Sequence, residues 1–203
     1  MNIIDKKDIF PRLKVGEFVS IELGCGPKKV DSSAIGIDML DFDSVDIVGD
    51  VFEVLSQFPD GSVSAVHSAH FFEHIADFSR LLQEVARVMK RDAQLTLIVP
   101  HFSNPFYYSD PTHKVQFGLY SMSYFCQQNL FSRKVPRYGL EVPLTLVRVE
   151  LGFKSYPPRY LRHAWKRLQG AVFNASMYLR EFYEENLCWL LPCYEIRYEL
   201  RKQ

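Results

Sequence analysis

Three short stretches of this chain combine residue types and spacings that could do chemistry. Two glycines, Gly24 and Gly26, directly follow an apolar run and let the backbone turn sharply and approach a ligand closely. A second stretch, residues 70–74, reads His-Phe-Phe-Glu-His. The third, residues 101–114, is rich in aromatic and turn residues and carries histidines and an aspartate. The chemistries that these residue types favour are cofactor binding, metal binding and acid–base catalysis.

The glycine turn does not fit a dinucleotide-binding site. Such a site needs a third glycine at the start of a helix and an acidic residue about 20 residues further on. Here Lys29 stands at the third glycine position, and the next strand ends at Asp38, 14 residues after Gly24. This connection is too short for a full helix, so NAD binding is disfavoured.

The His-x-x-Glu-His pattern of residues 70–74 matches a zinc-protease signature. A zinc site of that kind needs both histidines on one face of a helix and a third ligand downstream. The apolar run at residues 63–66 instead predicts a strand directly before the pattern. We therefore expect neither a metal site nor metalloprotease activity.

The loop at residues 101–114 is too long to be a simple connection, which makes it a candidate functional loop. It follows a predicted strand, and ligands in open α/β sheets bind at the carboxyl ends of strands. We take His113 as the candidate general base, because imidazole titrates near neutral pH. Asp110 or His101 would orient it, and Tyr108 completes the candidate catalytic set. The alternative, in which Asp110 caps a turn and His113 only packs, stays open.

Short apolar runs separated by turns must position these stretches. Continuous apolar runs predict strands that are buried on both faces, as in a parallel sheet covered by helices. Residues 78–89 repeat apolar side chains at helical spacing. This alternation predicts an α/β fold. The expected strands are residues 18–23, 34–37, 46–48, 63–66 and 95–99.

The pattern changes beyond residue 100. Residues 144–153 and 194–200 alternate as a sixth and a seventh strand, and apolar residues from 161 to 182 trace one long helical face between them. We expect a single domain over residues 1–203, with a helical excursion at about 157–190. The long helix either covers the sheet or docks a partner, a second copy of the chain or an anionic membrane surface. Its polar side carries Arg159, Arg162, Lys166 and Arg167.

Five stretches, taken in order, resemble the motifs of class I S-adenosylmethionine-dependent methyltransferases, in particular the broad bacterial type 11 group. The resemblance covers residues 18 to about 125. The loop at residues 101–114 is also similar to the D-P-T-H loop of one bacterial subgroup. The matching stretches are residues 22–27, 35–38, 46–51, 68–75 and the helix at 78–89, with Glu84, Arg87 and Lys90 in place.

This resemblance implies a Rossmann-like sheet of seven mostly parallel strands, with an antiparallel seventh strand and helices on both faces. It also implies S-adenosylmethionine as the cofactor. Asp38 would bond both ribose hydroxyls, Asp50 the adenine amine, and the backbone of Val51 a ring nitrogen. The full set of expected cofactor-binding residues is Glu22, Gly24, Cys25, Gly26, Asp38, Met39, Asp50, Val51, Ser68 and His70.

Composition narrows the class of protein. The 203 residues are 47% hydrophobic and carry 24 basic and 24 acidic side chains, which is not the composition of a disordered chain. Apolar runs fall far short of the roughly 20 residues of a membrane span. Four cysteines without a C-x-x-C pair favour reduced thiols and a cytoplasmic location. The first 100 residues have a net charge of −6 and the rest +6, which hints at an anionic acceptor.

These observations predict a methyltransferase that acts on a small or medium-sized acceptor, with an anionic or glycan-related molecule as the favoured class. A nucleic-acid methyltransferase is an alternative, because basic and aromatic residues interleave on the long helix. A net charge of zero and the absence of an N-P-P-Y-like motif give no strong nucleic-acid signal. A second alternative is a non-catalytic partner protein that binds the cofactor. The acceptor, the methylated atom and the oligomeric state stay open.

Overall fold

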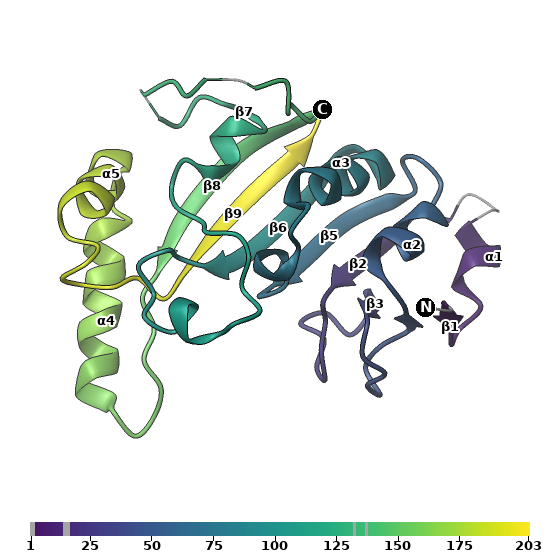
Figure 1. Cartoon of the computed structure of the whole chain (residues 1–203), viewed down its shortest axis with the longest axis horizontal. Helices are drawn as coiled ribbons and strands as arrows, with labels where there is room; N and C mark the ends of the chain where they lie inside the picture. Colours follow the sequence, from purple (N-terminus) through teal and green to yellow (C-terminus); the bar gives the residue numbers. More distant parts are fainter. Residues whose placement is uncertain (1–2, 14–16, 132, 137) are drawn as a thin grey trace.

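The computed structural model describes residues 3–13, 17–131, 133–136 and 138–203. In these residues nine strands form one sheet in the order β1-β4-β3-β2-β5-β6-β9-β8-β7 (Figure 1). The strands are β1 (Ile4–Asp5), β2 (Val19–Leu23), β3 (Ile35–Asp38), β4 (Ile47–Val48), β5 (Val63–Ala69), β6 (Met89–Pro100), β7 (Gln127–Gln128), β8 (Leu144–Gly152) and β9 (Glu195–Lys202). The helices are α1 (Ile9–Leu13), α2 (Val51–Ser56), α3 (Phe78–Val88), α4 (Tyr160–Phe173) and α5 (Met177–Asn186).

The centre of this sheet confirms the predicted Rossmann-like α/β fold. Strands β4, β3, β2, β5 and β6 run parallel, and β9 is antiparallel to both β6 and β8. The seventh predicted strand is therefore antiparallel, as expected. The two additional strands, β1 and β7, are two-residue edge strands, which are too short to leave a periodic signal in the sequence.

The connection between β2 and β3 has no helix in the described residues, as its length predicts. The backbone turns back at once, and the amide of Gly24 donates to the carbonyl of Ile37 at 2.9 Å. The alternating side chains of β2 and β3, such as Ile21 and Leu23, are buried in the core. This short turn leaves the carboxyl ends of the two strands open to a ligand.

Helices cover the sheet less completely than expected. Helices α2 and α3 pack together on one face, where Arg87 of α3 donates to the carbonyl of Leu55 of α2. The chain around Gly118 packs on β9, where the ring of Tyr198 contacts Phe117 and its hydroxyl donates to the carbonyl of Gly118. The opposite face of β8 and β9 presents Arg148, Arg197 and Arg201 to solvent. At β8 and β9 the described residues thus place loops over one face and leave the other face exposed to solvent.

The prediction of one long helix over residues 161–182 is wrong. The chain forms two helices there, α4 and α5, which lie beside the β8 edge of the sheet (Figure 1). The side chain of Asn174 ends α4 and bonds both the amide and the carbonyl of Leu151, at 2.9 and 2.8 Å. Ser176 then caps α5 by accepting from the amide of Leu179. No helix in the described part of the chain is long and apolar enough to cross a membrane.

Candidate functional site

The two glycines after β2 shape one wall of the site. Gly24 has φ of 65° and Gly26 has φ of 57°, a left-handed conformation that is costly for residues with a Cβ. The amide of Gly26 donates to Oδ2 of Asp38 at 2.9 Å. The turn is thus tied to the carboxyl end of β3.

A small cavity of about 40 Å³ lies beside this turn, at the carboxyl ends of β3 and β4. The structure brings four of the predicted cofactor-binding residues to it, and Asp50 also caps α2 through Oδ1. The other lining residues, among them Phe71 and Ile75, lie in stretches that resemble the family motifs but were not expected to bind the cofactor. The cavity is lined by Ile37, Asp38, Met39, Gly49, Asp50, Val51, Phe71 and Ile75.

Three other predicted residues lie away from this cavity and hold the fold. Both carboxylate oxygens of Glu22 accept from the amide of Val30, at 3.1 and 2.9 Å, and so close the loop after β2. The hydroxyl of Ser68 is buried and donates to the carbonyl of Leu23. Cys25 is also buried, and burial raises the pKa of its thiol to about 12. These side chains do not line the cavity.

Phe71 lies tightly against the glycine turn. A Cβ built on Gly24 would be 2.5 Å from the Cβ of Phe71, a distance that real atoms do not adopt. Phe71 comes from the segment that follows β5, residues 70–75. This segment is therefore the second wall of the cavity.

The same segment presents polar side chains away from the cavity. His70 has φ of 54°, unusual for a residue other than glycine, and its Nε2 lies 3.3 Å from Oε2 of Glu195. The carboxylates of Glu195 and Glu73 raise the pKa of His70 to about 9. Backbone strain of this kind concentrates at functional sites.

Three side chains gather on this polar side: Glu73, His74 and His113. One ligand-type atom from each lies within 4.8 Å of the others. His113 reaches the cluster from the loop after β6, where its ring stacks on Tyr107 and its Nδ1 lies 2.9 Å from the Tyr107 carbonyl. The sequence contained a signal for Glu73 and His74, the His-x-x-Glu-His pattern, but not their proximity to His113.

The remaining predicted catalytic residues divide into two groups. Oδ2 of Asp110 lies 3.6 Å from Nε2 of His113, whereas its Oδ1 accepts from the amide of Thr112. His101 lies elsewhere, with Nε2 3.0 Å from Oε2 of Glu184 and Nδ1 bonded to Ser103. Tyr108 is exposed and donates to the carbonyl of Phe102. Both nitrogens of His101 are engaged, so the expectation that it orients His113 is wrong.

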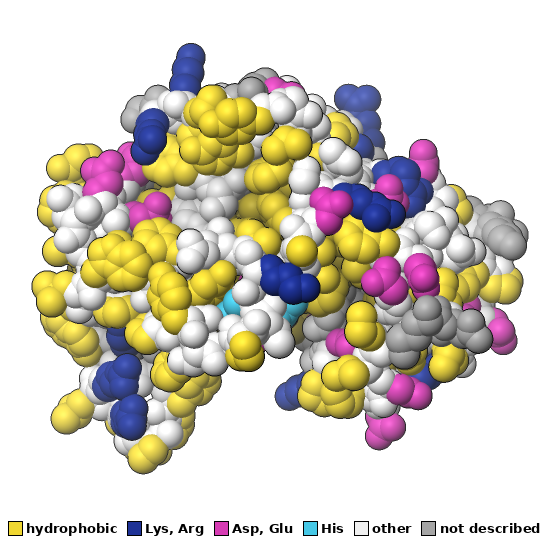
Figure 2. Space-filling model, viewed as in Figure 1, with side chains coloured by type: hydrophobic (Ala, Val, Ile, Leu, Met, Phe, Trp, Pro, Cys, Tyr) yellow, Lys and Arg dark blue, Asp and Glu magenta, His cyan; other side chains and the backbone are white. Residues whose placement is uncertain are grey.

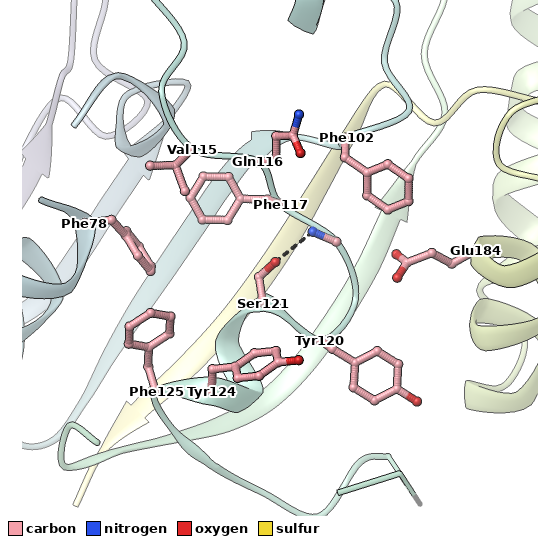
Figure 3. A pocket seen from close by; sticks show the side chains of 11 residues that line it. Phe78, Phe102, Val115, Gln116, Phe117, Tyr120, Ser121, Tyr124, Phe125 and Glu184 are labelled. Carbon is pink, nitrogen blue, oxygen red and sulfur yellow. Dashed lines mark hydrogen bonds between the residues drawn. The ribbon is translucent and has the colours of Figure 1, made fainter. Parts of the chain in front are cut away.

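Figure 2 shows a hollow in the middle of one face, with hydrophobic side chains around it and histidine atoms visible below it. A cavity of about 390 Å³ lies on this side of the sheet and is mostly aromatic (Figure 3). Phe78 and Phe125 stand on one side of it and Glu184 of α5 on the other. Oε2 of Glu184 already bonds His101 and the amide of Leu119, so this carboxylate belongs to the wall.

A further cavity of about 380 Å³ lies where the chain passes from β8 into α4, at residues 154–163. It is lined by residues 154–160 and His163, which combine tyrosines with basic side chains. Lys154 binds Oε1 of Glu195 at 2.5 Å, and Glu195 binds His70 through its other oxygen. Glu195 therefore links this cavity to His70.

Comparison with known proteins gives a match to a domain profile over part of the chain, and a fold. The profile of a family described as a methyltransferase domain matches residues 29–97. The chain has no match among curated proteins. The fold is shared with a SAM-dependent methyltransferase from Archaeoglobus fulgidus, at a TM-score of 0.56 and 16% identity over 97% of this chain and 94% of that one.

Two other solved structures share the fold. A putative methyltransferase from Bacillus halodurans C-125 matches at a TM-score of 0.54 and 14% identity, over 95% of this chain and 98% of that one. Phosphoethanolamine N-methyltransferase 2 from Haemonchus contortus, in complex with S-adenosyl-L-methionine, matches at 0.52 and 13% identity, over 92% of this chain and 49% of that one.

Proposed function

We propose that this chain is a class I S-adenosylmethionine-dependent methyltransferase that methylates a hydroxyl group of a small or medium-sized, anionic, glycan-related acceptor. The match of a methyltransferase-domain profile to residues 29–97 and the fold shared with a SAM-dependent methyltransferase support this proposal. One observation carries the proposal. The segment at residues 70–75 contributes Phe71 and Ile75 to the cavity beside the glycine turn, and Glu73 and His74 to the polar cluster. A cofactor and an acceptor would thus meet across a single short segment.

The residues at the small cavity fit the adenosine end of the cofactor. The carboxylates of Asp38 and Asp50 each have acceptor positions left after their backbone hydrogen bonds, and ribose and adenine supply the donors. When bound, S-adenosylmethionine supplies an electrophilic methyl carbon on a sulfonium. The protein's part is to hold the acceptor in line with that carbon and to exclude water.

His113 is the proposed proton acceptor for the hydroxyl. Its Nδ1 faces the carbonyl of Tyr107, which can only accept, so Nδ1 carries the hydrogen and Nε2 presents a lone pair. Asp110 beside Nε2 stabilises the imidazolium that forms. This arrangement keeps the general base that the sequence predicts and gives the orienting role to a backbone carbonyl.

The cavity at residues 154–163 is the proposed site for the rest of the acceptor. Tyrosine rings offer flat surfaces to a sugar, and Arg159 offers donors to a phosphate or carboxylate. Lys154 is already bonded to Glu195 and fixes the wall nearest to His70. This chemistry favours an anionic sugar derivative.

We also propose that α4 rests on an anionic membrane surface. Leu161, Trp165 and Leu168 lie on one side of the helix and are 90%, 54% and 54% exposed. Arg162 and Arg167 flank this apolar side. A twofold dimer through the same side would bring like charges together, whereas anionic headgroups would neutralise them.

The state of the cysteines supports a cytoplasmic location, which we propose on that ground. Cys25, Cys126, Cys188 and Cys193 are all free and buried. Burial raises the pKa of Cys126 to about 12, so its thiol stays neutral and unreactive. Free thiols are typical of proteins in a reducing compartment.

The test is transfer of a labelled methyl group to a panel of sugar phosphates and nucleotide sugars. Replacing Arg159 by Ala should raise KM for the acceptor about tenfold and leave kcat nearly unchanged, because a charge-assisted hydrogen bond is lost. Arg201→Ala, on the far face of β9, is the matched control and should change neither constant. Failure to methylate any member of the panel, or equal effects of the two substitutions, would refute the acceptor class.

A further inference from the structure

The buried carboxylate of Glu73 has no compensating hydrogen bond. Glu73 is fully buried, and neither of its carboxylate oxygens has a hydrogen-bond partner in the described residues. Its nearest basic atoms, Nδ1 of His70 and Nε2 of His74, lie 3.6 and 3.9 Å from Oε1. A buried carboxylate without partners is strongly unfavourable. His70 is directed to Glu195 through Nε2 and makes no hydrogen bond to Glu73, so this environment points to a second cation that binds the carboxylate directly.

Two imidazoles face the carboxylate with their lone pairs available. His113 donates through Nδ1 to the carbonyl of Tyr107, which leaves Nε2 unprotonated. Nδ1 of His74 lies 2.8 Å from the hydroxyl of Thr112, and that hydroxyl donates its own proton to Asp110. The hydroxyl oxygen must therefore accept from His74, and Nε2 of His74 is also unprotonated.

This pattern is typical of metal ligands. A histidine that binds a metal usually donates its second ring nitrogen to a carbonyl or another oxygen, which fixes the tautomer and the ring orientation. Both His74 and His113 make such a bond on the side away from Glu73. His70 differs, because its Nε2 is directed to Glu195.

We propose that Glu73, His74 and His113 bind one divalent transition-metal ion of the zinc class. Two imidazole nitrogens and one carboxylate oxygen are a ligand set for Zn²⁺ that leaves coordination positions open. The downstream ligand that the His-x-x-Glu-His pattern lacked is thus His113, supplied by the loop after β6. The expectation that this pattern holds no metal is replaced by this site.

The role of the ion rests on the proposed function. The ligands come from the segment that also lines the cofactor cavity and from the loop after β6, so an open coordination position is within reach of an acceptor hydroxyl. A divalent ion lowers the pKa of a bound hydroxyl, whose proton then passes to solvent water. With the ion bound, the lone pair of His113 is used as a ligand and the ion replaces it as the activating group.

Metal binding can be measured without any acceptor. The purified chain is freed of metal with a chelator and titrated with Co²⁺, followed by visible absorption, and with Zn²⁺, followed by calorimetry. We expect one equivalent of each ion. His113→Ala and Glu73→Gln should each weaken binding by at least about tenfold, which is the usual effect of losing one element of a metal site. His163→Ala, an exposed histidine outside the cluster, is the control and should bind normally.

Sub-stoichiometric binding by the unmodified chain, or unchanged binding by His113→Ala and Glu73→Gln, would overturn the metal site. Titration of the metal-free chain with S-adenosylhomocysteine separates this result from failure of the proposed function. Binding of the nucleoside without binding of Co²⁺ refutes only the metal site. Binding of Co²⁺ without the nucleoside refutes the methyltransferase proposal and leaves the metal site in place.

Discussion

At the scale of single residues, the two glycines of the turn after β2, Gly24 and Gly26, have different structural roles. Both adopt a left-handed backbone, so a Cβ at either position is strained. Only Gly24 is also crowded, because Phe71 lies against it, whereas nothing lies within 4 Å of a Cβ built on Gly26. Gly24 is therefore required for packing of the residue 70–75 segment as well as for the turn.

This difference gives a matched pair of substitutions. Gly26→Ala should cost about 1 kcal/mol of unfolding free energy, the strain of a left-handed residue. Gly24→Ala should cost clearly more, because Phe71 must also move, and overpacking typically adds about 1–3 kcal/mol. Urea unfolding of the two variants measures both values. Equal losses would mean that Phe71 does not press on Gly24.

Two single residues at the ends of strands lie together at one cavity, as their positions in the sequence predict. Asp38 and Asp50 follow buried apolar runs, and parallel strands bring their carboxyl ends to one edge of the sheet. Glu22 and Ser68 occupy similar positions in the sequence, yet their side chains bond backbone groups of the fold. Whether a side chain at the end of a strand points to the ligand site or into the fold depends on tertiary packing, which the sequence pattern does not show.

At the scale of elements, the strands could be predicted and the loops could not. The runs at 144–153 and 194–200 became β8 and β9 nearly unchanged, because alternation and burial determine a strand locally. The loop after β6 has no such period. His101 and His113 belong to the same loop, but they lie in different places. His101 bonds Glu184, whereas His113 lies beside Glu73, and only the folded structure of the loop shows this difference.

The break between α4 and α5 has a similar cause. The apolar spacing continues through Asn174, so periodicity alone predicts one helix. The amide of Asn174 instead bonds the β8 backbone at Leu151, and Ser176 begins a new helix. A tertiary hydrogen bond thus overrides the helical pattern.

At the scale of the whole molecule, the amphipathic pattern of α4 could mean that the helix covers the sheet or that it docks a partner. Its exposed apolar side favours docking. It does not cover the sheet, since Leu161, Trp165 and Leu168 are exposed. An apolar stripe between arginines, with a tryptophan in it, matches helices that lie in a membrane interface.

The membrane proposal predicts binding to vesicles that contain an anionic phospholipid. The double substitution Trp165→Ser and Leu168→Ser should weaken binding by at least about tenfold, because it removes two apolar side chains from the contact. Val147→Ser, an exposed apolar residue of β8, is the control. Co-sedimentation measures the bound fraction. Loss of binding in the control as well, or no binding by the unmodified chain, would contradict the proposal.

The cavity at the carboxyl ends of β3 and β4, which is lined by Asp38, Asp50 and Phe71, is the proposed binding site of S-adenosylmethionine. Calorimetric titration with S-adenosylmethionine and S-adenosylhomocysteine, on the unmodified chain and on Asp38→Ala, tests it most directly. We predict one equivalent bound by the unmodified chain and binding about 100-fold weaker in the variant, since two hydrogen bonds to a charged carboxylate are lost. No binding at millimolar ligand, or equal binding by the two proteins, would contradict the account.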